Sequence, residues 1–225
     1  FQGCPLSCKW CHNPESQAIP SLPKENKEPK FLSSIMKEIE KDRIFYEESG
    51  GGVTFSGGEP LCHPQLLVNL LDLCHEQQID TCIDTSGYAD PDILLQAARK
   101  TDLILYDIKL INGPLHKKFT GKSVSTVLEN LKRLSKHSTP VWLRFPFIPT
   151  ITDTDQNVKE IIEFVLKYTS YRDLYILPFH KAGEGKYEHL KMNNDMKDIQ
   201  VHQTEHINQA KQQFESRGFN VTVGG

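Results

Sequence analysis

The residues with the clearest chemical potential are three cysteines close to the start of the chain. Cys4, Cys8 and Cys11 are spaced C-x3-C-x2-C. Closely spaced thiols are typical of a metal site. Structural zinc sites commonly take four ligands from two pairs, whereas this chain has one group only. Three thiolates on a four-iron cluster would leave one iron open, as catalytic metal sites keep a position for substrate.

Two simpler interpretations stay open from the spacing alone: a zinc site completed by His12, or unliganded thiols. The remaining cysteines, Cys62, Cys74 and Cys82, stand singly, and we expect them to be small buried residues. A disulfide framework is not expected, because the chain is long, its cysteines are unevenly spread and no secretion signal is visible.

The composition is that of an ordinary globular protein. The 225 residues are 38% hydrophobic and 24% charged, with 26 basic and 29 acidic side chains and a formal net charge of −3. A chain of this length buries enough apolar surface to fold without disulfide bonds or a structural metal. The charge excludes a strongly basic nucleic-acid binder, and no run of about 18 apolar residues indicates a membrane span. We therefore expect a cytoplasmic protein with neither nucleic-acid nor membrane partners.

Strand-like and helix-like segments alternate along the chain. The strand starts lie 22 to 38 residues apart, which is the length of a βαβ unit and predicts a parallel sheet. Strands are expected at 53–55, 81–85, 103–109, 141–148, 174–177 and 219–223, and helices at 31–48, from 63–64 to 74, and at 90–98, 126–136, 153–168 and 195–217.

Local signals refine this pattern. Asp90 before Pro91 predicts a helix cap, and Thr126 with Glu129 predicts a capping box. Residues 18–30 are rich in Pro, Lys, Glu and Ser and predict a loop. A parallel α/β chain is an open doubly wound sheet or a barrel, and both place their chemistry at the carboxyl ends of the strands.

Polar residues recur at these expected strand ends. Each is unremarkable alone, because a single Asp or His at a strand end is usually a cap or a solvated side chain. Their recurrence after successive strands predicts one shared site. The pair Gly57-Gly58 permits close approach of backbone to a ligand, which suits a small, charged, amino-acid-like molecule. The polar residues are Glu59, Asp84, Asp107, Lys109, Arg144 and His180.

Five segments together carry a resemblance to a known family. They are Phe1–Ser16, Gly50–Pro60, Asp84–Tyr88, Tyr106–Lys109 and Leu177–His180. In this order they resemble the motifs of the radical S-adenosylmethionine (SAM) enzymes, and within them those of the activating enzymes of glycyl radical enzymes, such as the pyruvate formate-lyase activating enzymes. The resemblance covers essentially the whole chain and is most specific in the first two segments.

The resemblance implies a fold and a cofactor. The expected fold is a partial (β/α)6 barrel of the TIM type, a single domain over 1–225 with a cluster loop at 1–16 and a barrel core at about 50–223. It implies that Cys4, Cys8 and Cys11 hold one [4Fe-4S] cluster, whose fourth iron binds the amino and carboxylate groups of SAM. The chemistry belongs to these cofactors, so no separate acid or base is expected.

The resemblance also implies residue roles. Trp10 and His12 would flank the adenine, Gly58 would meet the methionine amino group through its backbone, and His180 would approach from the last strand. The full expected set of SAM contacts is Trp10, His12, Gly57, Gly58, Glu59, Asp107, Ile108, Lys109, Arg144 and His180. A monovalent cation site of the family corresponds to Asp84, Thr85, Asp107 and the backbone of Leu105.

The implied activity is reductive cleavage of SAM to a 5′-deoxyadenosyl radical, which takes a hydrogen from a glycine of a partner glycyl radical enzyme. Flavodoxin or ferredoxin is the expected electron donor, and a monomer the expected state. The alternatives are a radical SAM enzyme acting on a small molecule and a non-catalytic zinc module.

The chain departs from the family pattern in two places. No cysteine lies between Cys11 and Cys62, so we expect one cluster and no ferredoxin-like insert. Relatives usually have a further stretch before Phe1 that forms the first strand, so we expect a chain truncated at its N-terminus.

Overall fold

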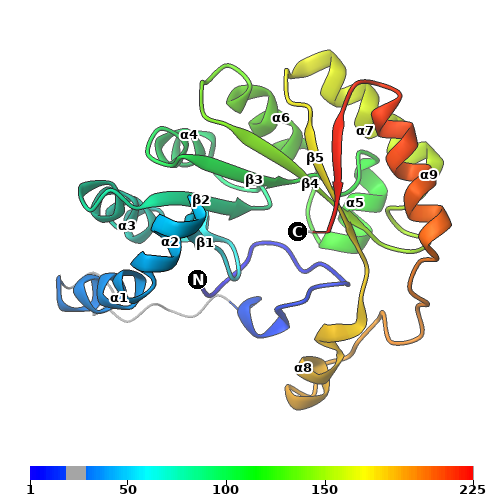
Figure 1. Cartoon of the computed structure of the whole chain (residues 1–225). Helices are drawn as coiled ribbons and strands as arrows, with labels where there is room; N and C mark the ends of the chain where they lie inside the picture. Colours follow the sequence, from blue (N-terminus) through cyan, green and yellow to red (C-terminus); the bar gives the residue numbers. More distant parts are fainter. Residues whose placement is uncertain (19–28, 225) are drawn as a thin grey trace.

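The computed structural model describes residues 1–18 and 29–224 (Figure 1). Most of the loop predicted over 18–30 therefore lies outside the described residues. Among the described helices, none is long and apolar enough to cross a membrane.

The core of the fold is one parallel sheet of six strands. The strands are β1 (Gly52–Phe55), β2 (Asp80–Thr85), β3 (Leu103–Asp107), β4 (Val141–Phe147), β5 (Asp173–Pro178) and β6 (Asn220–Val223). Their order in the sheet is their order in the chain. A doubly wound sheet would reverse its order at a switch point, so this sequential order, in a sheet that does not close, confirms the predicted partial barrel.

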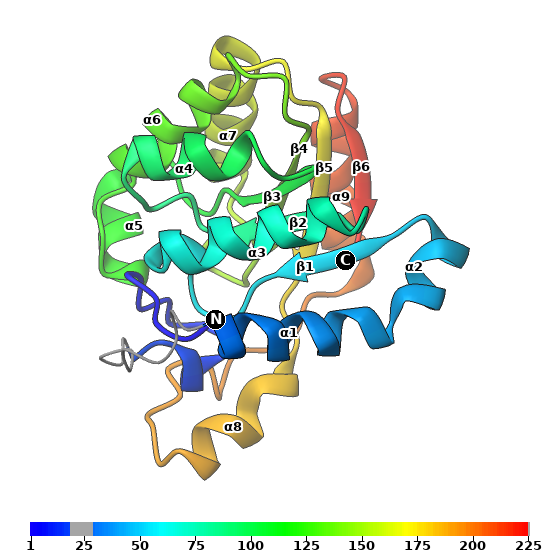
Figure 2. The same cartoon turned by 90° about the vertical axis from the view of Figure 1, so that its left-hand side faces the viewer.

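Helices cover the outer face of the sheet, as Figures 1 and 2 show for α3, α4, α6, α7 and α9. The helices are α1 (Pro29–Lys41), α2 (Arg43–Ser49), α3 (Pro64–Glu76), α4 (Pro91–Ala98), α5 (Gly113–Thr120), α6 (Ser125–Leu134), α7 (Asp155–Tyr168), α8 (Glu184–His189) and α9 (Thr204–Glu215). Short 3-10 turns occupy Pro14–Ser16, Pro60–Cys62 and Lys181–Gly183.

Alternation along β4 shows how the sheet separates core from site. Leu143 and Phe145 are fully buried and join the main apolar cluster with residues of the helices, among them Phe214 of α9. Arg144, between them, is only half-buried and lies on the opposite, concave face. The outer face therefore supplies the packing energy, and the concave face is free to carry polar groups.

The predicted helix over 31–48 is two helices, α1 and α2, separated at Asp42. Met36 and Ile39 hold α1 against the core, whereas no residue of α2 is buried. The apolar stripe does not continue, so nothing holds the two segments in line. Gly50 ends α2 with a positive φ of 64°, as the glycine run predicts.

The capping box predicted for α6 is wrong, and the helix cap predicted for α4 is confirmed. No capping box forms at α6, because its N-cap is Val124 and Thr126 lies inside the helix. Glu129 pairs with Lys132 and Arg133. Asp90 does cap α4, accepting from the backbone N–H of Asp92 and Ile93.

The last predicted helix, over 195–217, begins only at Thr204. The segment before it is an irregular connection that buries Met196 in a second apolar cluster beside the cysteine loop. Packing of that side chain takes the place of a helical turn.

The structure adds two helices that the periodicity did not predict. The buried residues of α5, His116 and Thr120, are polar. The sequence therefore shows no apolar stripe that would predict this helix. α8 has six residues, too few for a pattern. Of the isolated cysteines, Cys74 is buried as predicted, but Cys62 and Cys82 are half-buried.

Candidate functional site

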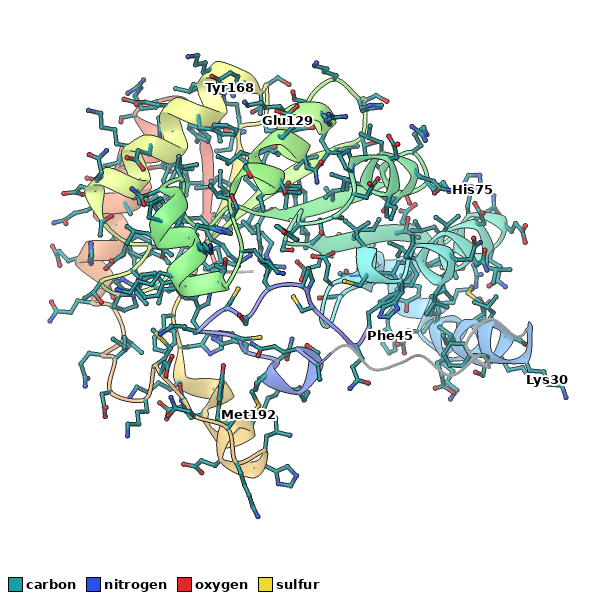
Figure 3. The ribbon with its side chains drawn as sticks, turned by 180° about the vertical axis from the view of Figure 1, so that it is seen from behind. Lys30, Phe45, His75, Glu129, Tyr168 and Met192 are labelled. Atoms are coloured by element: carbon teal, nitrogen blue, oxygen red, sulfur yellow. The ribbon has the colours of Figure 1, made fainter. Side chains whose placement is uncertain are left out.

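A cavity of about 390 Å³ lies at the carboxyl ends of the strands, between them and the N-terminal cysteine segment. Figure 1 shows this segment passing the strand ends, and in Figure 3 sulfur atoms lie beside it. Twelve of the predicted site residues line the cavity. They are Cys4, Cys8, Trp10, Cys11, His12, Gly57, Gly58, Asp84, Asp107, Lys109, Arg144 and His180.

Four predicted site residues do not line the cavity: Glu59, Thr85, Leu105 and Ile108. Ile108 is buried in the main apolar cluster. Glu59 is buried beneath the cavity wall. Its carboxylate accepts hydrogen bonds from Thr85 Oγ1 at 2.8 Å and from the N–H and Oγ of Ser86 at 2.8 and 2.6 Å. Burial raises the pKa of Glu59, and the bonds from Ser86 and Thr85 oppose that rise. Glu59 thus ties the loop after β1 to the end of β2.

Backbone bonds hold the cysteine segment on both sides. On one side, the N–H groups of Ser7 and Lys9 donate to the carbonyls of Thr120 and Phe119, at 2.9 and 3.0 Å. On the other side, Gly58 N–H donates to Phe1 O at 2.8 Å, and the N–H of residue 59 donates to the carbonyl of residue 3 at 2.7 Å. The segment is therefore suspended between the end of α5 and the diglycine turn.

The glycine pair serves this contact. A Cβ on Gly58 would overlap the carbonyl oxygen of Gly3, and Gly57 has a φ of 118°. The structure shows close approach of the cysteine segment to this turn. Both glycines also line the cavity, and the predicted approach of a ligand to them stays a prediction.

We expect Gly58→Ala to displace the cysteine segment, because the new methyl group has no space. Overpacking costs about 1–3 kcal/mol, and misplacement of reacting groups by about 1 Å can lower a rate about 100-fold. The iron content per chain and the amount of 5′-deoxyadenosine formed from SAM measure the effect. Gly185→Ala is the matched control, because its Cβ meets no atom within 4 Å; equal losses in both variants would contradict this role of Gly58.

Burial keeps two of the three thiols, those of Cys4 and Cys8, in the protonated form. Burial raises the pKa of Cys8 to about 12 and that of Cys4 to about 11. Metal binding must displace these protons. In the described part of the chain, the thiols are not a group whose ligand atoms lie within 4.8 Å of one another. They are spread too widely to share one ion, but a cluster offers each thiolate its own iron.

Four charged side chains form a network on the cavity wall. Arg144 Nη1 lies 2.8 Å from Asp84 Oδ2, and Lys109 Nζ lies 2.8 Å from Asp107 Oδ2. Burial disfavours the charge of Lys109, but Asp107 overrides this and leaves its pKa raised. Burial and the neighbouring Asp107 raise the pKa of Asp84, against the effect of Arg144.

Within the described residues, two buried atoms of this network make no hydrogen bond: Asp107 Oδ1 and Arg144 Nε. They lie 3.5 Å apart, and both residues line the cavity. The two residues bring one negative and one positive side chain to the same cavity wall. The wall therefore fits a ligand that carries both charges, as the methionine part of SAM does.

The predicted cation site stays a prediction. Arg144 already pairs with Asp84 and lies beside Asp107, so the guanidinium supplies positive charge to both carboxylates. The hydroxyl of Thr85 donates to Glu59.

Aromatic rings form another part of the wall. The rings of His12 and His180 lie 4.2 Å apart, and His12 Nε2 is buried without a partner. Burial, with His180 nearby, lowers the pKa of His12 and favours its neutral form. Trp10 packs with Phe179 and Ile148 in the second apolar cluster. These flat surfaces suit an adenine.

Helix α8 holds the cysteine segment from below, a contact that no sequence signal announced. Tyr187 Oη donates to the carbonyl of Cys11 at 2.8 Å, and Lys186 Nζ donates to Asn13 and Glu15, both at 2.7 Å. Ser56, which donates to Asp84 at 2.8 Å, is a further site residue that the motifs did not single out.

Comparisons with known proteins show to which superfamily the chain belongs. The model of the radical SAM superfamily matches residues 1–165. A radical SAM methyltransferase from Sphaerobacter thermophilus has the same fold, with a TM-score of 0.71 over 98% of this chain and 63% of its own, at 15% identity. The chain belongs to the radical SAM superfamily.

More similar relatives narrow the assignment. The trans-4-hydroxy-L-proline dehydratase activating enzyme of Clostridioides difficile is 34% identical over 100% of this chain and 92% of its own. The pyruvate formate-lyase-activating enzyme of Clostridium pasteurianum is 34% identical over 89% and 82%. A crystallised domain of such an enzyme from Bacteroides vulgatus superposes with a TM-score of 0.65 at 28% identity, over 78% of this chain and 99% of its own. Within the superfamily, the chain belongs to the glycyl radical enzyme activating enzymes.

The first of these alignments also bears on the expected single cluster. It spans 279 positions, more than the 225 residues of this chain. That relative therefore carries segments that this chain lacks, as expected if the ferredoxin-like insert is missing here.

Proposed function

We propose that this chain activates a glycyl radical enzyme. A [4Fe-4S] cluster on Cys4, Cys8 and Cys11 would supply one electron for homolytic cleavage of SAM, and the resulting 5′-deoxyadenosyl radical would take hydrogen from a glycine of the partner. The observation that carries the proposal is the cavity wall shared by the three thiols, the oppositely charged side chains of Asp107 and Arg144 and the aromatic rings.

The chain's own residues bind and orient. Asp107 and Arg144 would receive the ammonium and carboxylate of SAM, and His12 and His180 would lie against its adenine. Burial of the surrounding wall, with Ile148 and Phe179 nearly fully buried, excludes water from a radical reaction. None of these residues needs to donate or accept a proton.

The proposal also includes the domain organisation, the location, the oligomeric state, the electron donor and a bound cation. We propose one domain over 1–225 with a single cluster, a cytoplasmic monomer, and flavodoxin or ferredoxin as the electron donor. A monovalent cation beside Asp84 and Asp107 belongs to the proposal as well. The segment 181–195, which contains α8 and borders the cysteine segment, is the proposed region of partner selection.

An electron paramagnetic resonance experiment tests the proposal. The cluster-loaded protein is incubated anaerobically with dithionite, SAM and candidate glycyl radical enzymes. We expect a glycyl radical signal in one candidate, lost with Cys8→Ala and unchanged with Cys74→Ala. SAM cleavage without a protein radical in any candidate would favour a small-molecule substrate instead.

A further inference from the structure

A second group of ligand-type side chains lies away from the cavity. Asp153 is in the loop between β4 and α7, His202 is in the connection just before α9, and His206 lies in the first turn of α9. Their ligand atoms fall within 4.8 Å of one another, the one such group in residues 1–18 and 29–224. His202 stacks on Phe147, with ring centroids 4.4 Å apart. The residues on either side of Phe147 line the cavity, so this group sits on the outer face of β4.

The distances in this group suit one shared ion. His202 Nε2 lies 3.1 Å, and His206 Nδ1 3.7 Å, from Oδ2 of Asp153. A tetrahedral ion with bonds of about 2.0–2.2 Å separates its ligand atoms by about 3.4 Å, and the two distances bracket that value. A hydrogen bond accounts for the position of His202, but 3.7 Å is too long for one from His206.

Charge also favours an ion. The side chain of Asp153 is 9% exposed, and its ion-pair partners among the described residues are these two imidazoles, with no lysine or arginine. A buried carboxylate needs positive charge nearby, and a divalent ion would supply it.

The surroundings hold the buried side chains of Asp153 and His202 in place and leave space for a water molecule beside His206. The side chain of His202 is 2% exposed and held by the Phe147 ring, whereas that of His206 is 44% exposed. Two imidazoles and a carboxylate match the ligand preference of zinc and neighbouring transition metals. Solvent at His206 can provide the fourth ligand.

We propose that Asp153, His202 and His206 bind one divalent transition-metal ion, for which Zn²⁺ is the probe. The ion ties the loop after β4 to the start of α9. Ile148, at the other end of that loop, lines the cavity, so the ion stiffens one cavity wall from behind. His202 Nδ1 is buried and makes no hydrogen bond to any residue that the structure describes. A ligating histidine whose other ring nitrogen makes no hydrogen bond typically binds its metal about 10–100-fold more weakly. We therefore expect weaker Zn²⁺ binding than at a zinc site whose histidines all have such a bond.

The test is Zn²⁺ binding to the cluster-loaded protein, measured in competition with a chromophoric chelator. We expect one equivalent bound by the wild type. His206→Ala and Asp153→Asn should bind at least tenfold more weakly, while His189→Ala, an exposed histidine at the end of α8, binds as the wild type does. A hundredfold excess of Zn²⁺ over Kd should raise the Tm by about 5–10 °C, and this rise should vanish in His206→Ala.

His206 is half-exposed, so its alanine variant keeps the test valid even where Asp153→Asn unfolds. Equal Zn²⁺ affinity in the wild type and His206→Ala would overturn the proposal, because the ion would then sit elsewhere, for example on thiols. Absence of a saturable equivalent in the wild type would overturn it too.

Discussion

Cys8→Ala abolishes cluster assembly, the largest effect that we expect from any single substitution in this chain. A [4Fe-4S] cluster is held by thiolates, and only three are available on the cavity wall. After anaerobic reconstitution, the wild type should hold about 4 irons per chain with broad visible absorption, and the variant should be nearly colourless. SAM cleavage should fall to background with the iron.

Cys74→Ala is the matched control, because it removes a thiol from the apolar core without touching the cavity. It should keep full iron content and lose about 1 kcal/mol of stability, as for a small deletion in a packed core. An intact cluster in Cys8→Ala, or loss of the cluster in both variants, would show that the ligand assignment is wrong. One zinc per chain with no colour would establish the zinc module instead.

Glu59→Ala should cause the largest loss of stability among the motif residues. Its carboxylate accepts from Thr85, from both donors of Ser86 and from the N–H of Leu61. Each buried donor left without an acceptor costs about 1–3 kcal/mol. We expect a loss of at least about 3 kcal/mol in the free energy of unfolding, measured by urea denaturation.

The exposed Glu129→Ala provides the comparison, because its pairs with Lys132 and Arg133 lie on the surface and such pairs contribute about 0–1 kcal/mol. If Glu59→Ala also folds with wild-type stability but loses SAM binding, Glu59 contacts the ligand directly, as the resemblance implies, and the structural role argued above is wrong.

Much of the fold could be predicted because its signals are local and repeated. The stripe in α7 from Val158 to Leu166 and the βαβ spacing need no knowledge of the partner elements. The strand-end rule likewise placed Asp107, Lys109 and Arg144 on one wall, because parallel strands present their carboxyl ends together.

What the sequence could not predict depends on contacts between distant segments. The burial of Met196 beside Trp10 replaces the expected start of the last helix. The contact of Tyr187 with the Cys11 carbonyl brings together residues 176 positions apart. Glu59 follows β1 and Asp84 lies near the end of β2, but only Asp84 lines the cavity. The carboxylate of Glu59 instead accepts from Thr85 and caps the 3-10 turn that follows it.

The central claim is that the cavity between the cysteine segment and the strand ends cleaves SAM reductively. The most direct test is quantification of 5′-deoxyadenosine and methionine after anaerobic incubation of the cluster-loaded protein with SAM and dithionite. The claim predicts both products in equal amounts, dependent on the reductant and absent with Cys8→Ala. A protein that carries its full iron content and binds SAM but forms neither product would contradict it.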